Sequence, residues 1–165
     1  MTQTLGQVYL KELEMEAPST RKCLERITPE TFEFKPHERS MKMGYLAQTV
    51  AEIPKWIAAT ITAGEVNFQT WEHTKIETTD DLVKFFDTNM EMARAALSVV
   101  TDEAMQEMFY LKNGDQELIK STKDESVSSS INHLVHHRGQ VTVYMRLNEI
   151  LVPSTYGPSA DDKTF

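Results

Sequence analysis

The chain has 165 residues, of which 40% are hydrophobic and 25% charged, and this composition and length predict a single globular domain spanning 1–165. The net charge of −8 argues against nucleic-acid binding, because phosphate contacts need a basic face. No apolar run approaches the ~20 residues of a membrane span, and charges come too early for a signal peptide, so we expect a cytoplasmic protein that contacts no membrane.

The N-terminal quarter of the chain predicts one long helix. Apolar residues recur at helical spacing over about 4–26, with Thr4 as the N-cap. Pro18 interrupts the pattern and either kinks or splits this helix. The only cysteine, Cys23, lies in it among charged residues. It excludes an internal disulfide, and we interpret its thiol as structural.

A second helix is predicted from Met41 to Ala63, capped by Ser40 and ended by Gly64. Pro54 lies inside it and should bend it. One face of this helix mixes polar and aromatic side chains. That face is either the wall of a site or the wetter edge of the core. Its members are Tyr45, Thr49, Glu52 and Trp56.

The middle of the chain predicts a linker followed by a third helix. Residues 65–78 lack a regular pattern, and we assign no role to His73 within them. Thr79, with acids directly after it, begins a helix that continues to about residue 100. Residues 101–108 predict one or two further helical turns.

The C-terminal third predicts a hairpin, a last long helix and a tail. Asn113 and Gly114 suit the tight turn of a small β-hairpin near 109–119. A helix then follows over about 124–149, and the remaining tail should wrap the surface or reach a partner subunit. Four long helices with short connections indicate an all-α four-helix bundle to which the hairpin is added.

The last helix concentrates the side chains that can carry chemistry. His133 and His137 are four residues apart, so they share one face and can bind one divalent ion together. The alternative is a pair of partly buried, hydrogen-bonded histidines. His136 points about 100° away and should pack elsewhere. Arg138 is interpreted as half of a structural ion pair, or otherwise as a group that binds an anionic substrate.

Two segments resemble the DinB family of four-helix bundles. NHLVHHRGQVTVYMRL, followed by VPSTYGPSADD, is similar to the last helix and tail of that family. FKPHERSMKMGYLAQTVAEIPKWI is similar to its loop and second helix. With the comparable length and helix order, the resemblance covers nearly the whole chain.

This resemblance implies a divalent metal, commonly nickel, zinc or iron, held by three histidines. The pair from the last helix corresponds to His133 and His137. The third family position precedes the triplet Val50-Ala51-Glu52 and is Thr49 here. A neutral hydroxyl is a poor ligand for such an ion, so the site should be weakened. Glu52, one turn further along, is the better substitute ligand.

The resemblance also implies a reaction class. Relatives include S-transferases and isomerases that use low-molecular-weight thiols such as bacillithiol or mycothiol, so we expect a metal-dependent thiol transferase or hydrolase of small molecules. The alternatives are a metal-depleted binding or stress-response protein without catalysis and a purely structural dimer. Relatives pair through helix faces, so a homodimer is expected. From helical spacing, the candidate substrate contacts are Tyr45, Trp56, Gln140 and Tyr144.

Overall fold

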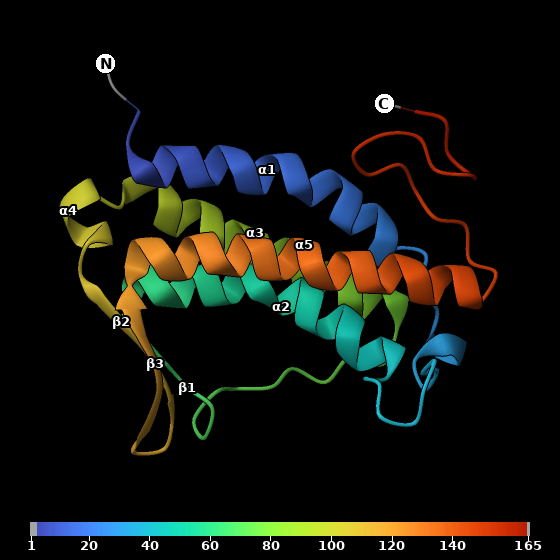
Figure 1. The fold of residues 1–165 in the computed structure, drawn as a ribbon, viewed down its shortest axis with the longest axis horizontal. Helices are drawn as coiled ribbons and strands as arrows, with labels where there is room; N and C mark the ends of the chain where they lie inside the picture. The colour runs from blue at the N-terminus through green and yellow to red at the C-terminus, as the bar shows by residue number, and fades with distance from the viewer. Residues whose placement is uncertain (1–2, 165) are drawn as a thin grey trace.

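Residues 3–164 are described by a computed structural model, in which four long helices run along one another (Figure 1). The prediction of a mostly helical fold is therefore confirmed. The four long helices are α1 (Leu5–Leu24), α2 (Met43–Thr62), α3 (Thr79–Val99) and α5 (Lys123–Leu147). The smaller elements are a 3-10 turn (Pro29–Thr31), α4 (Asp102–Met105), β1 (Glu65–Asn67), β2 (Met108–Asn113) and β3 (Gln116–Thr122).

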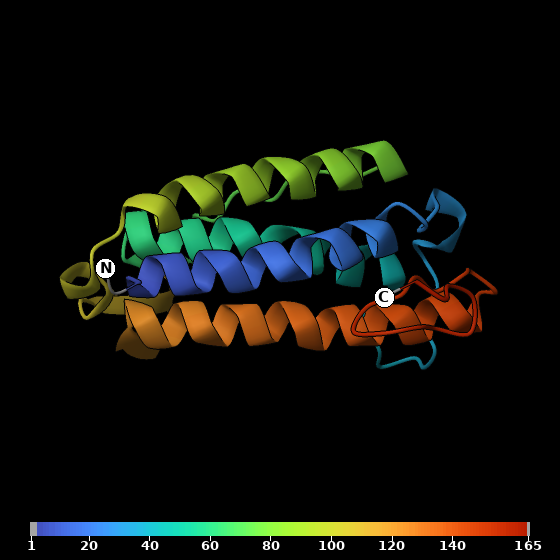
Figure 2. The ribbon, with the colours of Figure 1, turned by 90° about the horizontal axis from the view of Figure 1, so that it is seen from above.

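The core lies between the four long helices. Helix α2 packs against both α3 and α5, and α1 packs against the same two helices from the other side (Figure 2). Each helix contributes fully buried apolar side chains, and their removal from water is the main force that holds the helices together. Examples are Leu13, Ile57, Phe86 and Leu134.

Three of the long helices begin at a threonine that caps them. The side chains of Thr4, Thr78 and Thr122 each accept a hydrogen bond from the backbone N–H of the residue three positions later. The side chain of that later residue in turn accepts a bond from the backbone N–H of the threonine. The predicted cap of α2 is wrong. Ser40 closes the preceding turn by donating its N–H to the carbonyl of His37, and α2 begins at Met43 after an extended Lys42 that makes no side-chain cap.

The prolines inside the helices do not split them. Helices α1 and α2 run continuously through Pro18 and Pro54, so neither proline splits its helix. Gly64 ends α2 as predicted. Its φ of 68° lies in the left-handed region that glycine tolerates, and its N–H bonds back to the carbonyl of Ala59.

The sheet is larger than the sequence predicted. The hairpin of β2 and β3 is confirmed, with Gly114 at φ 62° in its turn. Residues 65–67, predicted as the start of a linker, instead form β1, which pairs in parallel with β2. A strand of three residues carries no alternation that a sequence pattern can detect. The strand order is β1-β2-β3.

The C-terminal tail folds back onto the helices. Arg146 at the end of α5 pairs with Asp161, and the hydroxyl of Tyr156 donates to the carboxylate of Glu16 on α1. The same carboxylate pairs with Arg138 of α5 at 2.6 Å, so the structural interpretation of Arg138 is confirmed. One buried carboxylate thus joins α1, α5 and the tail.

The single cysteine, Cys23, is buried. Burial raises the pKa of the Cys23 thiol to about 11, so this thiol is protonated at neutral pH and the structural interpretation is confirmed.

Across residues 3–164, no helix is both long enough and apolar enough to traverse a lipid bilayer.

Candidate functional site

A cavity of about 420 Å³ lies between α2, α5 and the segment that follows β1. We call it the histidine cavity. Helix α2 forms one wall with residues spaced one turn apart, and α5 contributes two histidines. Aromatic side chains from the segment after β1 form a further wall. The lining residues are Met41, Tyr45, Thr49, Glu52, Ile53, Trp56, Phe68, Trp71, His73, His133 and His137.

The structure brings most of the predicted site residues together on this wall. Both histidines of the last helix line the cavity, as does the whole mixed face of the second helix: Tyr45, Thr49, Glu52 and Trp56. The mixed polar and aromatic face of the second helix therefore lines a cavity.

The two histidines stack over each other inside the cavity. Their ring centroids are 4.4 Å apart and the planes are tilted by 52°. Burial lowers the pKa of His133, and the neighbouring imidazoles of His137 and His136 lower it further. His133 is therefore neutral at physiological pH and can accept a proton.

Gln140 fixes the orientation of His137. The amide Oε1 lies 2.6 Å from His137 Nδ1, and only 7% of His137 is exposed. Because an amide oxygen only accepts, Nδ1 carries the proton and Nε2 keeps its lone pair. Gln140 thus supports the site through His137 and is not part of the cavity wall.

The buried carboxylate oxygen of Glu52 has no hydrogen-bond partner among the described residues. Its exposed fraction is 9%, and its buried Oε1 bonds to no atom of the part of the chain that the structure describes. A buried carboxylate normally pairs, since removing its charge from water is costly. Trp71 Nε1 is also buried without an acceptor among the described residues. Two unsatisfied polar atoms of opposite character therefore belong to one cavity.

Thr49 lies at the position that corresponds to the third histidine ligand of the family, and its hydroxyl is already bonded. The Thr49 hydroxyl donates to the carbonyl of Tyr45 at 2.9 Å, so its proton is already used by the helix backbone. Within residues 3–164, no three histidine, cysteine, aspartate or glutamate side chains converge closely enough to hold one ion together. Glu52 shares the cavity with both histidines but does not complete a ligand group with them.

His73 is a lining residue that the sequence did not indicate. It lies in an irregular segment without any local pattern, and it reaches the wall because β1 pairs with β2 and directs the following residues across α2. Only the sheet pairing would have identified it.

Two candidate residues of the last helix lie elsewhere. Tyr144 packs edge-on against Phe34, with ring centroids 5.9 Å apart, and is not among the lining residues. His136 is exposed on the outer side of α5, although its ring centroid is 5.1 Å from that of His137. His136 therefore lies outside the cavity, and the prediction that it packs elsewhere is wrong, because its ring lies beside that of His137.

A second cavity of about 460 Å³ adjoins the first towards the sheet. The two share Trp56, Phe68 and His133. The far part of the second cavity is lined by hydroxyl groups at the start of α5, including Ser126, Ser129 and Ser130. The candidate site therefore continues from a carboxylate at one end to hydroxyl groups at the other.

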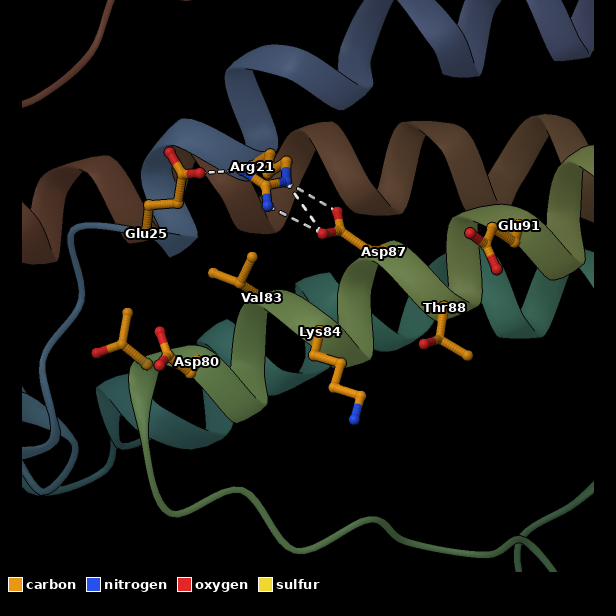
Figure 3. Close-up of a pocket in the computed structure, with 9 residues that line it drawn as sticks. Arg21, Glu25, Asp80, Val83, Lys84, Asp87, Thr88 and Glu91 are labelled. Atoms are coloured by element: carbon orange, nitrogen blue, oxygen red, sulfur yellow. Dashed lines mark hydrogen bonds and ion pairs between the residues drawn. The ribbon is translucent and has the colours of Figure 1, made fainter.

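A third cavity, of about 590 Å³, lies between α1 and α3 (Figure 3). The charged side chains at its centre form ion pairs with each other. Arg21 donates to Asp87 at 2.9 Å and also pairs with Glu25. It contains no histidine and neither of the unsatisfied polar atoms noted above. We therefore take the histidine cavity as the candidate site.

Comparison with known proteins agrees with the resemblance in sequence. The model of the DinB family matches residues 1–164. The uncharacterized protein YrdA of Bacillus subtilis is 29% identical, over 98% of this chain and 93% of its own length. A crystal structure of the DinB-like protein YjoA from Bacillus subtilis aligns with a TM-score of 0.68 and 23% identity, covering 94% of this chain and 99% of that one. A DinB-like protein from Bacillus cereus aligns with a TM-score of 0.67 and 22% identity, covering 94% and 100%.

Proposed function

The chain belongs to the DinB family, and we propose that it binds a small molecule in the histidine cavity, at a site that lacks the three-histidine metal centre. One observation carries this proposal. Glu52 and Trp71 both line the cavity, and each has a buried polar atom, Glu52 Oε1 and Trp71 Nε1, without a partner in residues 3–164. Each such atom loses its hydrogen bonds to water on folding. A ligand with one donor and one acceptor would satisfy both.

The remaining side chains suit a role in orienting and deprotonating that ligand. His133 is neutral at physiological pH because burial lowers its pKa, so it can take a proton from a bound hydroxyl, thiol or amine. The Gln140 side chain holds His137 in one orientation, and Nε2 of that ring is available to accept a hydrogen bond. The aromatic walls exclude water from around these groups.

The family also implies a divalent ion, and the donor set does not fit the usual site. Thr49 replaces the third histidine and uses its hydroxyl proton on the carbonyl of Tyr45. No three acidic, histidine or cysteine side chains among the described residues converge on one point. We therefore assign the ligand-binding role to the protein groups alone.

Binding should be visible in the intrinsic fluorescence of the protein. Both tryptophans of the sequence, Trp56 and Trp71, line the cavity. We expect titration with small cationic, neutral and anionic organic compounds to give at least one saturable fluorescence change. Thr49→Phe fills the cavity and should weaken that binding by at least about tenfold, or ~1.4 kcal/mol.

Thr62→Phe is the matched control, because Thr62 lies on the same helix, is exposed and is not a lining residue of the cavity. It should bind like the unaltered protein. A fluorescence signal that no compound changes, or equal binding by the two variants, would contradict the proposed function.

A second candidate function is metal-dependent chemistry on a thiol or a hydrolysable small molecule. It is favoured by the hydrogen bond between His137 Nδ1 and Gln140 Oε1, because metal-binding histidines usually donate their other nitrogen to such an acceptor. In this case His133 and His137 would be the two protein ligands, since Glu52 does not converge with them, and the ion would lower the pKa of a bound thiol or water.

Elemental analysis distinguishes this candidate from the first. Metal dependence predicts about one equivalent of nickel, zinc or iron per chain, with a loss of at least ~10-fold in metal affinity in His137→Ala. His136→Ala is the matched control, since His136 is the exposed neighbour outside the cavity. Protein that retains no metal after incubation with nickel or zinc would exclude the second candidate.

A further inference from the structure

We infer that the ligand of the histidine cavity is a small organic cation, whose ammonium group pairs with Glu52 and packs against the rings of Trp56 and Trp71. The inference rests on the proposed function, because it names the class of the small molecule bound there. It depends on three separate features of the cavity, which are its charge, the isolation of its carboxylate and its aromatic walls.

The lining of the cavity carries one carboxylate and no lysine or arginine, and its only basic side chains are three histidines. The carboxylate is that of Glu52. Only 9% of this side chain is exposed, so solvent screens its charge poorly. A cation entering the cavity would compensate the charge, whereas an anion would be repelled by it.

The nearest lysine on α2 does not neutralise Glu52. Lys55 is three residues along the helix, a spacing at which side chains commonly pair. Its ammonium instead donates to the carbonyl of Glu72 at 3.1 Å and lies 4.4 Å from the ring centroid of Trp71. Lys55 is absent from the cavity lining. The carboxylate is therefore left for a group that comes from outside the chain.

The aromatic walls supply the second half of a cation site. The ring centroids of Trp56 and Trp71 are 5.8 Å apart, and the planes meet at 72°. The ring centroids of Phe68 and Trp56 are 5.7 Å apart, and Tyr45 also lines the cavity. Faces of aromatic rings attract cations through their quadrupole, tryptophan most strongly, and this attraction grows where water is excluded. The ammonium of Lys55 already lies over one face of Trp71, so a bound cation would contact the remaining ring faces.

Three compounds of nearly the same shape isolate the effect of charge. Choline is the cation, 3,3-dimethylbutan-1-ol is its neutral isostere and 3,3-dimethylbutanoate is the anion. Tryptophan fluorescence of protein treated with a chelator gives the dissociation constant of each. We expect choline to bind at least about tenfold more tightly than the alcohol, which corresponds to ordinary cation–π and charge contributions. The anion should bind more weakly than either.

Substitution of the carboxylate should remove this preference. Glu52→Gln keeps the shape of the side chain and should bind choline and the alcohol equally, while its affinity for the alcohol stays within about threefold of the unaltered value. Because it removes a buried unpaired charge, the variant should fold and melt no lower than the unaltered protein. Glu91→Gln on α3 removes an exposed carboxylate far from the lining and should keep the preference.

The outcomes separate this inference from the proposed function. Equal binding of the three compounds, or tighter binding of the anion, would overturn the cation while leaving a small-molecule cavity in place. Failure of every compound to bind would overturn both. A second experiment adds zinc or nickel alone. If either metal saturates the fluorescence signal at one equivalent, displaces choline and fails to bind to Glu52→Gln, then the carboxylate binds a metal ion. That result would exclude the organic cation.

Discussion

Replacing Arg138 with alanine is expected to lower the free energy of unfolding by about 3–5 kcal/mol. The Arg138 side chain is 3% exposed and its guanidinium pairs with the Glu16 carboxylate, which is 11% exposed. The same guanidinium donates to the carbonyl of Glu16 and to the hydroxyls of Ser19 and Thr20. Its removal leaves the buried Glu16 carboxylate without a compensating charge and takes one donor from each of these three oxygens.

Urea unfolding followed by circular dichroism would measure this loss. The double variant Arg138→Met with Glu16→Met removes both charges and should regain most of the lost stability, because apolar residues of similar size replace a buried pair without penalty. Arg39→Ala is the exposed control and should change stability by less than about 0.5 kcal/mol. A loss below about 1 kcal/mol in Arg138→Ala would show that the pair is solvated.

Replacing Gly6 with alanine is expected to cost about 2–3 kcal/mol, since the added methyl group overpacks a tight contact between α1 and α3. A Cβ at this position would lie 2.5 Å from the carbonyl oxygen of Leu97 and 2.7 Å from Val100 Cγ1. The first of these atoms belongs to the backbone, so it cannot rotate away. The two helices must separate for the substitution to fit.

Gly139→Ala is the same substitution at another position of the chain, but here we expect the stability of the protein to increase. A Cβ on Gly139 would meet no atom within 4 Å, and alanine in the middle of α5 should stabilise the protein by about 0.5–1 kcal/mol. Thermal unfolding of the two variants measured side by side would test the contact. If both variants changed stability in the same direction, the close approach of α1 and α3 would be disproved.

The helical part of the fold was predictable because its signals are local. The Thr4 cap, the acids at the starts of α3 and α5 and the apolar spacing placed α1, α3 and α5 within about two residues of their observed bounds. One error depends on a contact that is distant in the sequence, and the other on a local turn that competes with the predicted cap. Strand β1 exists only through its pairing with β2, and Ser40 lost its predicted cap role because it closes a turn with His37.

The candidate site was predictable in part for the same reason. Periodicity alone places Thr49 and Glu52 on one face of α2, and His133 and His137 on one face of α5. It cannot reveal that Lys55 turns towards the carbonyl of Glu72, which is what isolates Glu52. Such an outcome depends on tertiary packing, and propensity carries no information about it.

The parallel pairing of β1 and β2 has a consequence for how the protein matures. The side chain of Asn67 in β1 bonds to both the N–H and the carbonyl of Gly114 in the hairpin turn. The segment that carries Trp71 and His73 starts directly after this attachment. Helix α2 can already hold that segment through Lys55 and Glu72, but the bonds to Asn67 cannot form until the hairpin has emerged, and the wall of α5 comes later still. Because contacts between distant segments form slowly, we expect the cavity to be completed last, after the helical core has already packed.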